Sequence, residues 1–206
     1  MGLYEKYVLP KFLDFAMRQP PIMRQRAKVV PKASGETLEI GIGSGLNLEF
    51  YETSAVTKLW GLDPSMELRV LAAARAAEAG IDVEFVGLSG EDIPLEDASV
   101  DSVVTTYTLC TIPDPVKALK EMRRVLRPTG QLIFTEHGLA PDASVVRWQN
   151  RMNSMWGKFS GGCNVNRDVP TMLTDGGFAS QSIETMYLPG PRPLTFNYWG
   201  TARVAG

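Results

Sequence analysis

The sequence has little of the residue types on which many functional sites depend. Among its 206 residues it holds two cysteines and one histidine. Cys110 and Cys163 stand far apart in the chain, which is not the spacing of a disulfide framework or of a clustered zinc motif. A single histidine, His137, leaves little scope for a histidine-ligated metal. We therefore expect no metal centre and no disulfide framework.

Excess charge of one sign and long hydrophobic runs are also missing. The formal net charge is −2, so the chain offers no basic surface for nucleic acid or anionic lipid. It has no apolar run of about 18 residues, which a membrane-spanning helix requires, and no signal-peptide pattern. We expect one domain, residues 1–206, in a reducing cytoplasm. The sequence leaves the oligomeric state open.

What the chain does have is glycine concentrated at one point. Residues 38–45 read LEIGIGSG, so that an acid in an apolar run, Glu39, precedes three glycines at alternate positions: Gly41, Gly43 and Gly45. Such a turn lets the backbone approach a nucleotide-like ligand closely. A second acid, Asp63, ends the next apolar run, where a carboxylate can bind ribose hydroxyls. The pattern predicts an adenosine site.

Missing residues narrow the type of cofactor. The dinucleotide pattern G-x-G-x-x-G would place its last glycine at Leu46, and no Gly-Lys-Ser/Thr of a P-loop follows. Glu39 would repel a pyrophosphate but attract a cation, so a cofactor with a sulfonium and an ammonium group fits better. A nicotinamide-dependent reductase is thereby disfavoured. The remaining alternative is a strand-to-helix turn with no chemical role.

Apolar runs alternate with helical patterns, which is typical of parallel strands joined by crossover helices. Strands are predicted over residues 37–40, 58–62, 83–86, 100–105, 132–135, 180–186 and 195–202. Asp63-Pro64 and Asp114-Pro115 each match a helix N-cap followed by a first-turn proline. The predicted fold is α/β: a Rossmann-like, mostly parallel seven-stranded sheet with an antiparallel C-terminal hairpin and helices on both faces.

These motifs resemble the class I S-adenosylmethionine-dependent methyltransferases of the small type 11 group. The resemblance covers nearly the whole chain: the glycine motif, GLDPS at 61–65, GEDIPL at 90–95, TYTL at 106–109 and LRPTGQL at 126–132. In the last motif Thr129 replaces the first glycine of the L-x-P-G-G turn of the family. The resemblance implies S-adenosylmethionine as cofactor, bound by Glu39, Gly41, Gly43, Gly45, Asp63, Pro64, Met66, Gly90, Glu91 and Thr106.

The N-terminal segment, residues 1–31, is predicted to be a helical lid. An aromatic amphipathic helix that contains Tyr7 is interrupted by Pro10, and a basic helix with Arg24, Arg26 and Lys28 follows. In open α/β sheets the ligand lies outside the carboxyl ends of the strands, where such a segment can cover it. Packing on the flank of the sheet and contact with a partner are the alternatives. Residues 138–178 are predicted to form a cap.

Methyl transfer from a sulfonium is an in-line displacement, so the site must chiefly align the acceptor and exclude water. The tips of the fourth and fifth strands would face the methyl group. His137, with an ordinary pKa of about 6.5, is the predicted base, and Tyr107 is predicted to donate a hydrogen bond or shape the pocket. The residues predicted to contact the acceptor are Tyr7, Cys110, Arg147, Trp148, Cys163 and Arg167.

The stretch from Glu136 to Arg167 resembles a subgroup whose animal members act on small thiols, while some bacterial relatives are labelled phospholipid N-methyltransferases. A thiol needs only one weak base. A phosphoethanolamine head group would need a cationic cluster, which Arg147, Arg167 and Arg192 could provide. We expect a small-molecule acceptor, with a small thiol favoured. A lipid head-group N-methyltransferase that touches a bilayer through its N-terminus, and a cofactor-binding module without catalysis, stay open.

Overall fold

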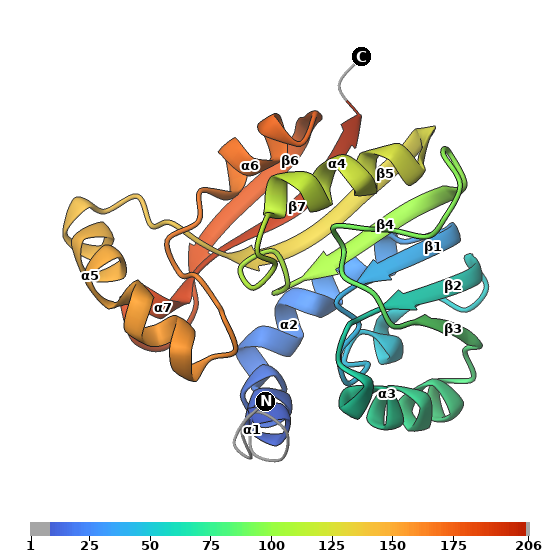
Figure 1. The fold of residues 1–206 in the computed structure, drawn as a ribbon, viewed down its shortest axis with the longest axis horizontal. Coiled ribbons are helices and arrows are strands. Elements are labelled where there is room, and N and C mark those ends of the chain that lie inside the picture. The colour runs from blue at the N-terminus through green and yellow to red at the C-terminus, as the bar shows by residue number, and fades with distance from the viewer. Residues whose placement is uncertain (1–8, 205–206) are drawn as a thin grey trace.

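A single mixed sheet organises the molecule (Figure 1). The structure, a computed structural model, describes residues 9–204, without the side chains of Lys11, Met66, Ser180 and Gln181. The strands are β1 Gly35–Ile40, β2 Val56–Leu62, β3 Val83–Val86, β4 Val100–Thr106, β5 Leu126–His137, β6 Phe178–Tyr187 and β7 Phe196–Val204. Their order is β3-β2-β1-β4-β5-β7-β6. The first five strands pair in parallel, and β7 pairs antiparallel with both β5 and β6, which confirms the predicted sheet and hairpin.

Helices cover both faces of the sheet, as predicted (Figure 1). They are α1 Leu9–Met17, α2 Pro20–Val29, α3 Met66–Ala79, α4 Pro115–Val125, α5 Ala143–Phe159, α6 Val169–Asp175 and α7 Arg192–Thr195. Helices α4 and α6 pack on one face, α2 and α3 on the other, and α5 packs with α7 beyond the carboxyl end of β5. No helix within residues 9–204 is both long and apolar enough to cross a membrane.

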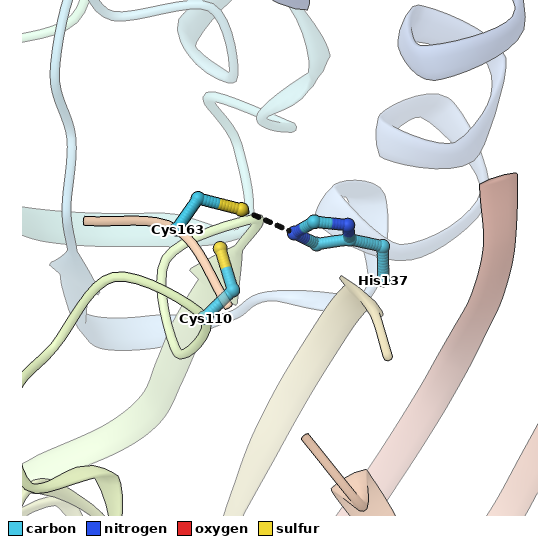
Figure 2. A group of neighbouring side chains, drawn as sticks. All are labelled: Cys110, His137 and Cys163. Atoms are coloured by element: carbon cyan, nitrogen blue, oxygen red, sulfur yellow. Dashed lines mark hydrogen bonds between the residues drawn. The ribbon is translucent and has the colours of Figure 1, made fainter. Parts of the chain in front are cut away.

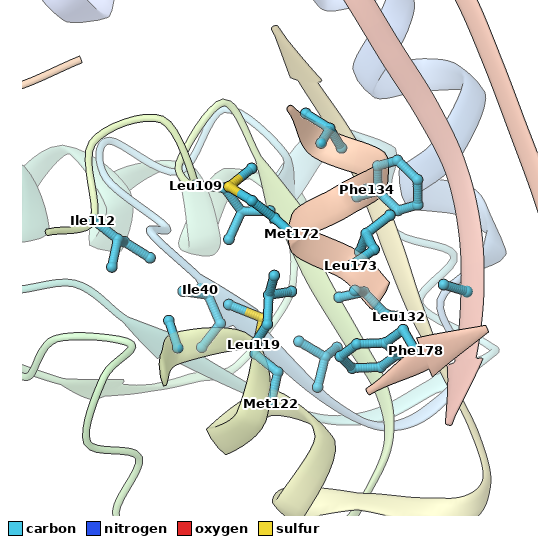
Figure 3. Packing of buried hydrophobic residues seen from close by; sticks show 14 of the residues in the cluster. Ile40, Leu109, Ile112, Leu119, Met122, Leu132, Phe134, Met172, Leu173 and Phe178 are labelled. Atoms are coloured by element: carbon cyan, nitrogen blue, oxygen red, sulfur yellow. The ribbon is translucent and has the colours of Figure 1, made fainter. Parts of the chain in front are cut away.

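Each face of the sheet has its own buried core because successive strand residues point to opposite sides. Phe134 and Leu132 of β5 belong to the cluster under α4 and α6, where they join Leu119, Met122 and Leu173 (Figure 3). The cluster on the opposite face includes Val29, Ala76, Ile133 and Trp199. The central strands are therefore buried on both sides, and their carboxyl ends are left as the place for a site.

The two predicted Asp-Pro helix starts have different outcomes. Asp114 is the N-cap of α4 and accepts a hydrogen bond from the Lys117 backbone N–H at 2.9 Å, as predicted. The prediction that Asp63 caps the next helix is wrong, because α3 begins at Met66 with Ser65 in the N-cap position. The Asp63 carboxylate instead accepts from the backbone of the glycine loop.

Other differences from the predicted elements are at their ends. Helix α4 ends at Val125, and β5 begins at Leu126 rather than at 132. Pro10 is the second residue of α1, and the part of the predicted helix before it lies outside the described residues. The proline-rich loop after β6 contains the start of α7. None of these differences moves the carboxyl edge of the sheet.

Candidate active site

The glycine loop after β1 uses its three glycines for two different purposes. All three have positive φ: 70° at Gly41, 53° at Gly43 and 81° at Gly45. A Cβ added to Gly41 would lie 2.3 Å from the Thr108 side chain, and one added to Gly45 would lie 3.0 Å from Cα of Ala72. At Gly43 the nearest atom would be 3.8 Å away. Gly41 and Gly45 thus allow tight packing, whereas Gly43 alone leaves space for a ligand.

Asp63 lies at the end of β2, directly across from that loop. Its carboxylate accepts from Gly43 N at 2.9 Å and from Ser65 N at 2.7 Å, and burial raises its pKa. A carboxylate offers about four lone-pair positions, so acceptor capacity is left for ribose hydroxyls. A crevice beside it is lined by Ile42, Gly43, Gly61, Asp63, Ser65, Arg69, Phe85, Val86 and Gly87. This is the predicted adenosine position.

Glu39 lies beneath the glycine loop rather than in the crevice. It is buried, and its two oxygens accept from Asn47 Nδ2 at 2.9 Å and from the Tyr51 hydroxyl at 2.7 Å. Burial raises its pKa to about 7, although these bonds and the Arg26 cation act against the rise. Glu39 therefore ties β1 to the segment after the loop. Its predicted contact with the cofactor stays a prediction.

Arg26 belongs to the predicted basic helix, α2, and no site role was predicted for it. It is buried and donates to Thr106 Oγ1 and to Asn47 Oδ1, the latter at 2.8 Å. Its guanidinium lies 5.4 Å from the centre of the Tyr107 ring. Among the described residues its Nε finds no hydrogen-bond partner. One signal was available, since Arg26 stands three residues before Val29 and so shares its buried helical face.

The remaining predicted cofactor residues lie around the crevice but do not line it. Pro64 is exposed, and Met66 is placed only by its backbone at the start of α3. Gly90 is packed so closely that an added Cβ would be 2.9 Å from Ile40 Cγ2. Glu91 accepts from Ser89 Oγ at 3.0 Å and from Asp114 N at 3.1 Å, and Thr106 is bonded as described above. Their cofactor roles stay predictions.

Residues that the sequence analysis did not select line the crevice instead. Arg69 of α3 and residues 85–87 at the end of β3 form one wall. The Arg69 guanidinium lies 5.1 Å from the centre of the Phe85 ring. The available signal was the position of Phe85 in the third strand, whose carboxyl end meets the same edge of the sheet.

Tyr107 follows β4 in an unusual backbone conformation. Its φ is 55°, and only Ala98 shares a positive φ among the described non-glycine residues. Such a conformation in a bulky residue costs about 1–3 kcal/mol and is often kept at functional sites. The Tyr107 hydroxyl donates to Asn197 Oδ1 of β7 at 2.7 Å, and its ring centre lies 6.4 Å from that of His137. Asn197 is a further residue that the sequence analysis did not select.

Glu136 holds the loop after β4 in place. It is buried, and its Oε1 accepts from Thr108 N at 2.9 Å, Leu109 N at 3.2 Å and Thr105 Oγ1 at 3.1 Å. Burial raises the pKa of Glu136 to about 8. Within residues 9–204, its Oε2 has no partner. The loop that carries Tyr107 and Cys110 is thereby fixed to β5.

The two cysteines and the histidine meet at the end of β5 (Figure 2). Cys163 Sγ lies 3.0 Å from His137 Nε2, and these atoms and Cys110 Sγ are all within 4.8 Å of one another. The two cysteines, which stand far apart in the chain, therefore lie together in the fold. Both cysteines are buried, whereas His137 is partly exposed. The cap loop comes to this place because Asn164 N and Nδ2 both donate to Cys110 O, at 2.9 and 3.1 Å.

The pKa values of these three groups depend on one another. A hydrogen bond from the Cys163 thiol brings the pKa of Cys110 well below its usual value, burial opposes this, and His137 assists it. The Cys110 sulfur in turn raises the pKa of Cys163. Burial lowers the pKa of His137, but the Cys110 thiolate raises it by more. Nε2 of the predicted base is therefore already engaged by a thiol of the protein.

The other residues predicted to contact the acceptor are not gathered here. Arg147 and Trp148 are exposed on α5, and Tyr7 lies outside the described residues. Arg167 donates to the carbonyl oxygens of Leu109 and Ile112, the latter at 2.7 Å, and so closes the loop after β4. Of the other arginines considered for a phosphate group, Arg192 pairs with Asp142 at 2.8 Å on the surface.

Helix α1 runs between the cofactor loop and the cap loop. Asp14 accepts from Ser44 Oγ of the glycine loop at 2.5 Å and from Arg75 Nη1 of α3 at 2.9 Å. At the other side, a Cβ added to Gly161 would lie 3.4 Å from Leu9 Cδ2. This position is the one a lid requires, and lid function itself stays a prediction.

Comparison with known proteins places this geometry in a family. The family described as "Methyltransferase domain" matches residues 38–134. Human thiol S-methyltransferase TMT1B is 36% identical over 167 residues, which cover 79% of this chain and 66% of that protein. Human thiol S-methyltransferase TMT1A is 31% identical over 163 residues, which cover 77% of this chain and 66% of that protein. The chain belongs to the class I S-adenosylmethionine-dependent methyltransferases, type 11 group.

Solved methyltransferase structures share the fold. A geranyl diphosphate methyltransferase in complex with S-adenosylmethionine superposes with a TM-score of 0.67 at 16% identity, covering 89% of this chain and 84% of that one. A methyltransferase from Aquifex aeolicus gives a TM-score of 0.65 at 19% identity, covering 95% and 97%. This methyltransferase chain spans 61–66% of the length of its thiol S-methyltransferase relatives.

The crevice fits the cofactor of the family, S-adenosylmethionine. Gly43 leaves room where a side chain would intrude, and Asp63 keeps acceptor capacity for the ribose. Gly41 and Gly45, which lack a Cβ, allow the tight packing of the loop that keeps the space beside Gly43 open. Gly43 and Asp63 are therefore the residues of this methyltransferase that we assign to the nucleoside part.

Proposed function

We propose that this protein transfers the methyl group of S-adenosylmethionine to a small thiol. The observation that carries the proposal is the set of side chains after β4 and β5: Tyr107, Cys110 and His137, with Cys163 from the cap loop. These positions follow the carboxyl ends of β4 and β5, where we expect an acceptor to meet the methyl group. They offer an aromatic ring and soft sulfur, and the arginines expected for a phosphate are bonded elsewhere or exposed.

The chemistry requires little beyond ionisation and alignment. A thiol with an ordinary pKa of about 8.5 is a few per cent thiolate at pH 7, yet the thiolate is strongly nucleophilic. The acceptor thiol loses its proton to solvent, and its sulfur forms a bond to the methyl carbon as the bond from carbon to the sulfonium breaks. The electron pair of the broken bond stays on the cofactor sulfur, so the products are a thioether and S-adenosylhomocysteine.

The relatives support the same acceptor class. Both human relatives named above are thiol S-methyltransferases at more than 30% identity. A phosphatidylethanolamine N-methyltransferase from Cereibacter sphaeroides is 28% identical over 137 residues. This lower identity gives less support to the alternative acceptor, a lipid head group. Burial of Arg26 removes one charge from the basic helix that could have touched anionic lipid.

An acceptor panel tests the proposal. The chain is incubated with S-adenosylmethionine and a small alkyl thiol, the matched alkyl amine, phosphoethanolamine, or phosphatidylethanolamine vesicles, and S-adenosylhomocysteine is measured. We expect turnover with the thiol at least tenfold above the amine and both phosphoethanolamine forms. Methylation of the lipid with none of the thiol would reverse the assignment. Cofactor binding without turnover on any acceptor would support the non-catalytic alternative.

A further inference from the structure

The cluster of Cys110, His137 and Cys163 is more than the methyl transfer requires, because alignment and one weak base suffice for that step. Three groups that prefer soft metals come from three separate elements: the loop after β4, the end of β5 and the cap loop after α5. Figure 2 shows the two sulfurs and the imidazole edge pointing toward one another. The convergence of these three side chains calls for a physical explanation.

Their separations suit a tetrahedral ion. Bond lengths of about 2.3 Å to sulfur and about 2.0 Å to nitrogen place neighbouring zinc ligands roughly 3.5–3.8 Å apart. The three ligand atoms lie within 4.8 Å of one another, and the 3.0 Å contact between Cys163 Sγ and His137 Nε2 is a hydrogen bond that an ion would replace. Opening that contact by about half an ångström is within the reach of side-chain rotation.

The site is built in advance of any ion. Asn164 fixes the cap loop to Cys110 through two hydrogen bonds, and its own Oδ1 accepts from Asn153 Nδ2 of α5 at 2.9 Å. Arg167 fixes the other side of the loop after β4 through the carbonyl oxygens of Leu109 and Ile112. Ligands held by such outer contacts lose little freedom when they bind a metal.

The surroundings favour zinc over hard cations. The cysteines pack with Val165, Trp156 and Leu194, and no carboxylate within residues 9–204 joins the group. Magnesium and calcium require oxygen ligands, whereas the three converging groups offer two sulfurs and one nitrogen. Two thiolates and one imidazole are a known catalytic zinc set, in which three protein ligands leave a fourth position for a substrate.

We propose that Cys110, His137 and Cys163 bind one Zn²⁺ and that the acceptor thiol takes the fourth position as a thiolate. The second part rests on the proposed function. Coordination releases the thiol proton to solvent and keeps the sulfur ionised at neutral pH. His137 is then a ligand rather than the base. The bound sulfur forms the new bond to the methyl carbon, the carbon–sulfonium bond breaks toward the cofactor sulfur, and the neutral thioether leaves the metal.

Metal binding is measured first, without any enzyme assay. The untagged 206-residue chain is kept reduced, titrated with Zn²⁺ or Co²⁺, and its metal content is determined after dialysis. We expect one Zn²⁺ per chain and a thiolate-to-cobalt charge-transfer band. The chain contains two cysteines and one histidine, so that band reports on this site alone. Less than 0.2 equivalents of bound Zn²⁺ (about one chain in five) would overturn the proposal.

Variants then test the ligand set. Cys110→Ser, Cys163→Ser and His137→Ala are each expected to weaken Zn²⁺ binding more than about 100-fold, beyond the roughly 10–100-fold loss typical of an outer contact. Asn166→Ala is the matched control, because it removes only the bond of Asn166 to Asn150 in the same loop. Thermal unfolding of the metal-free variants identifies any that fail to fold. For the folded variants, the Co²⁺ spectra show whether the substituted residue is a metal ligand. Wild-type affinity in the cysteine variants contradicts the ligand assignment.

Assays of thiol methylation distinguish the proposed role of zinc from the proposed thiol acceptor. Chelation should reduce thiol methylation at least tenfold, and one equivalent of Zn²⁺ should restore it. Thiol methylation at the full rate by the metal-free chain overturns the role of zinc and leaves the thiol acceptor standing. A chain that binds Zn²⁺ through all three side chains but methylates no thiol supports the metal site and overturns the acceptor assignment.

Discussion

The three glycines of the loop after β1 make different contacts, and single substitutions should separate their roles. Gly43→Ala adds a methyl group that meets no atom within 3.8 Å, so the cost to folding is mainly that of positive φ, about 1 kcal/mol. The methyl group would occupy the space assigned to the cofactor. We expect affinity for S-adenosylhomocysteine, measured by calorimetry, to fall at least tenfold while the melting temperature changes by only a few degrees.

Gly45→Ala is the comparison for that variant. It carries a similar φ cost, but its Cβ would press on Leu48 at 2.7 Å and on the α3 backbone at Ala72. We expect a loss of stability of about 2–4 kcal/mol from the combined strain and overpacking. Equal affinities for the cofactor product in wild type and Gly43→Ala would contradict the assignment of Gly43 to the nucleoside.

At the scale of single residues, the sequence predicted site residues that are close in the chain. It did not predict clusters of residues that only the fold brings together. The glycine loop and Asp63 are close in sequence and belong to one strand–turn–strand unit, so their relation is readable locally. Cys110 and Cys163 come together only because Asn164 binds the carbonyl oxygen of Cys110, a tertiary contact with no sequence period. The burial of Arg26 could not be predicted for a related reason, since its partners lie on other elements.

Among the helices, α1 contacts both the glycine loop and the cap loop, as a lid over the crevice would. One carboxylate, Asp14, joins it to the glycine loop and to α3, and Leu9 lies beside the cap loop. Asp14→Ala should therefore loosen α1 over the crevice. We expect a two- to tenfold faster dissociation of S-adenosylhomocysteine, measured by stopped-flow fluorescence, with a small change in melting temperature.

Arg18→Ala is the control for this prediction. Arg18 also pairs with Asp14, at 3.8 Å, but its side chain is 60% exposed, and such surface pairs contribute little. Its dissociation rate should match the wild type. If Asp14→Ala also leaves the rate unchanged, α1 merely packs on the flank of the sheet.

Regular elements were predicted better than their ends. The alternation of apolar runs with helical patterns identified the seven strands of the described sheet, whose central members are buried on both faces. The start of α3 was misplaced because the Asp63 side chain binds Gly43 instead of capping the helix. When a local and a distant backbone group can both bond to a side chain, the sequence alone does not predict which of them the side chain binds.

On the scale of the whole molecule, ionisable groups are buried at the carboxyl edge of the central strands. Glu39 of β1 and Glu136 of β5 are both buried, and Arg26 enters from α2 with a charge of opposite sign. One cation faces two carboxyl groups, so the folded protein is expected to hold protons that the unfolded chain releases. Stability should then depend on pH even though the formal net charge is only −2.

Glu39 allows a test of whether the free energy of unfolding falls or rises with pH. Burial raises its pKa from 4.5 to about 7, so between these values the folded state binds more protons than the unfolded state, and the free energy of unfolding falls as pH rises. From pH 5 to pH 8 this group alone should remove roughly 2–3 kcal/mol, at about 1.4 kcal/mol per pKa unit. Urea unfolding at several pH values measures the slope.

The variant Glu39→Gln isolates this contribution. Glutamine cannot ionise, so the decrease in stability with pH should be shallower than in wild type, although the variant loses about 1 kcal/mol at pH 5 through its altered bond to Tyr51 or Asn47. Glu136, His137 and the thiols titrate in both proteins, so the difference between the two slopes belongs to Glu39. The exposed Glu52→Gln should keep the wild-type slope. Parallel curves for wild type and Glu39→Gln would mean that Glu39 stays ionised in the folded protein, held by Arg26 and its two hydrogen bonds.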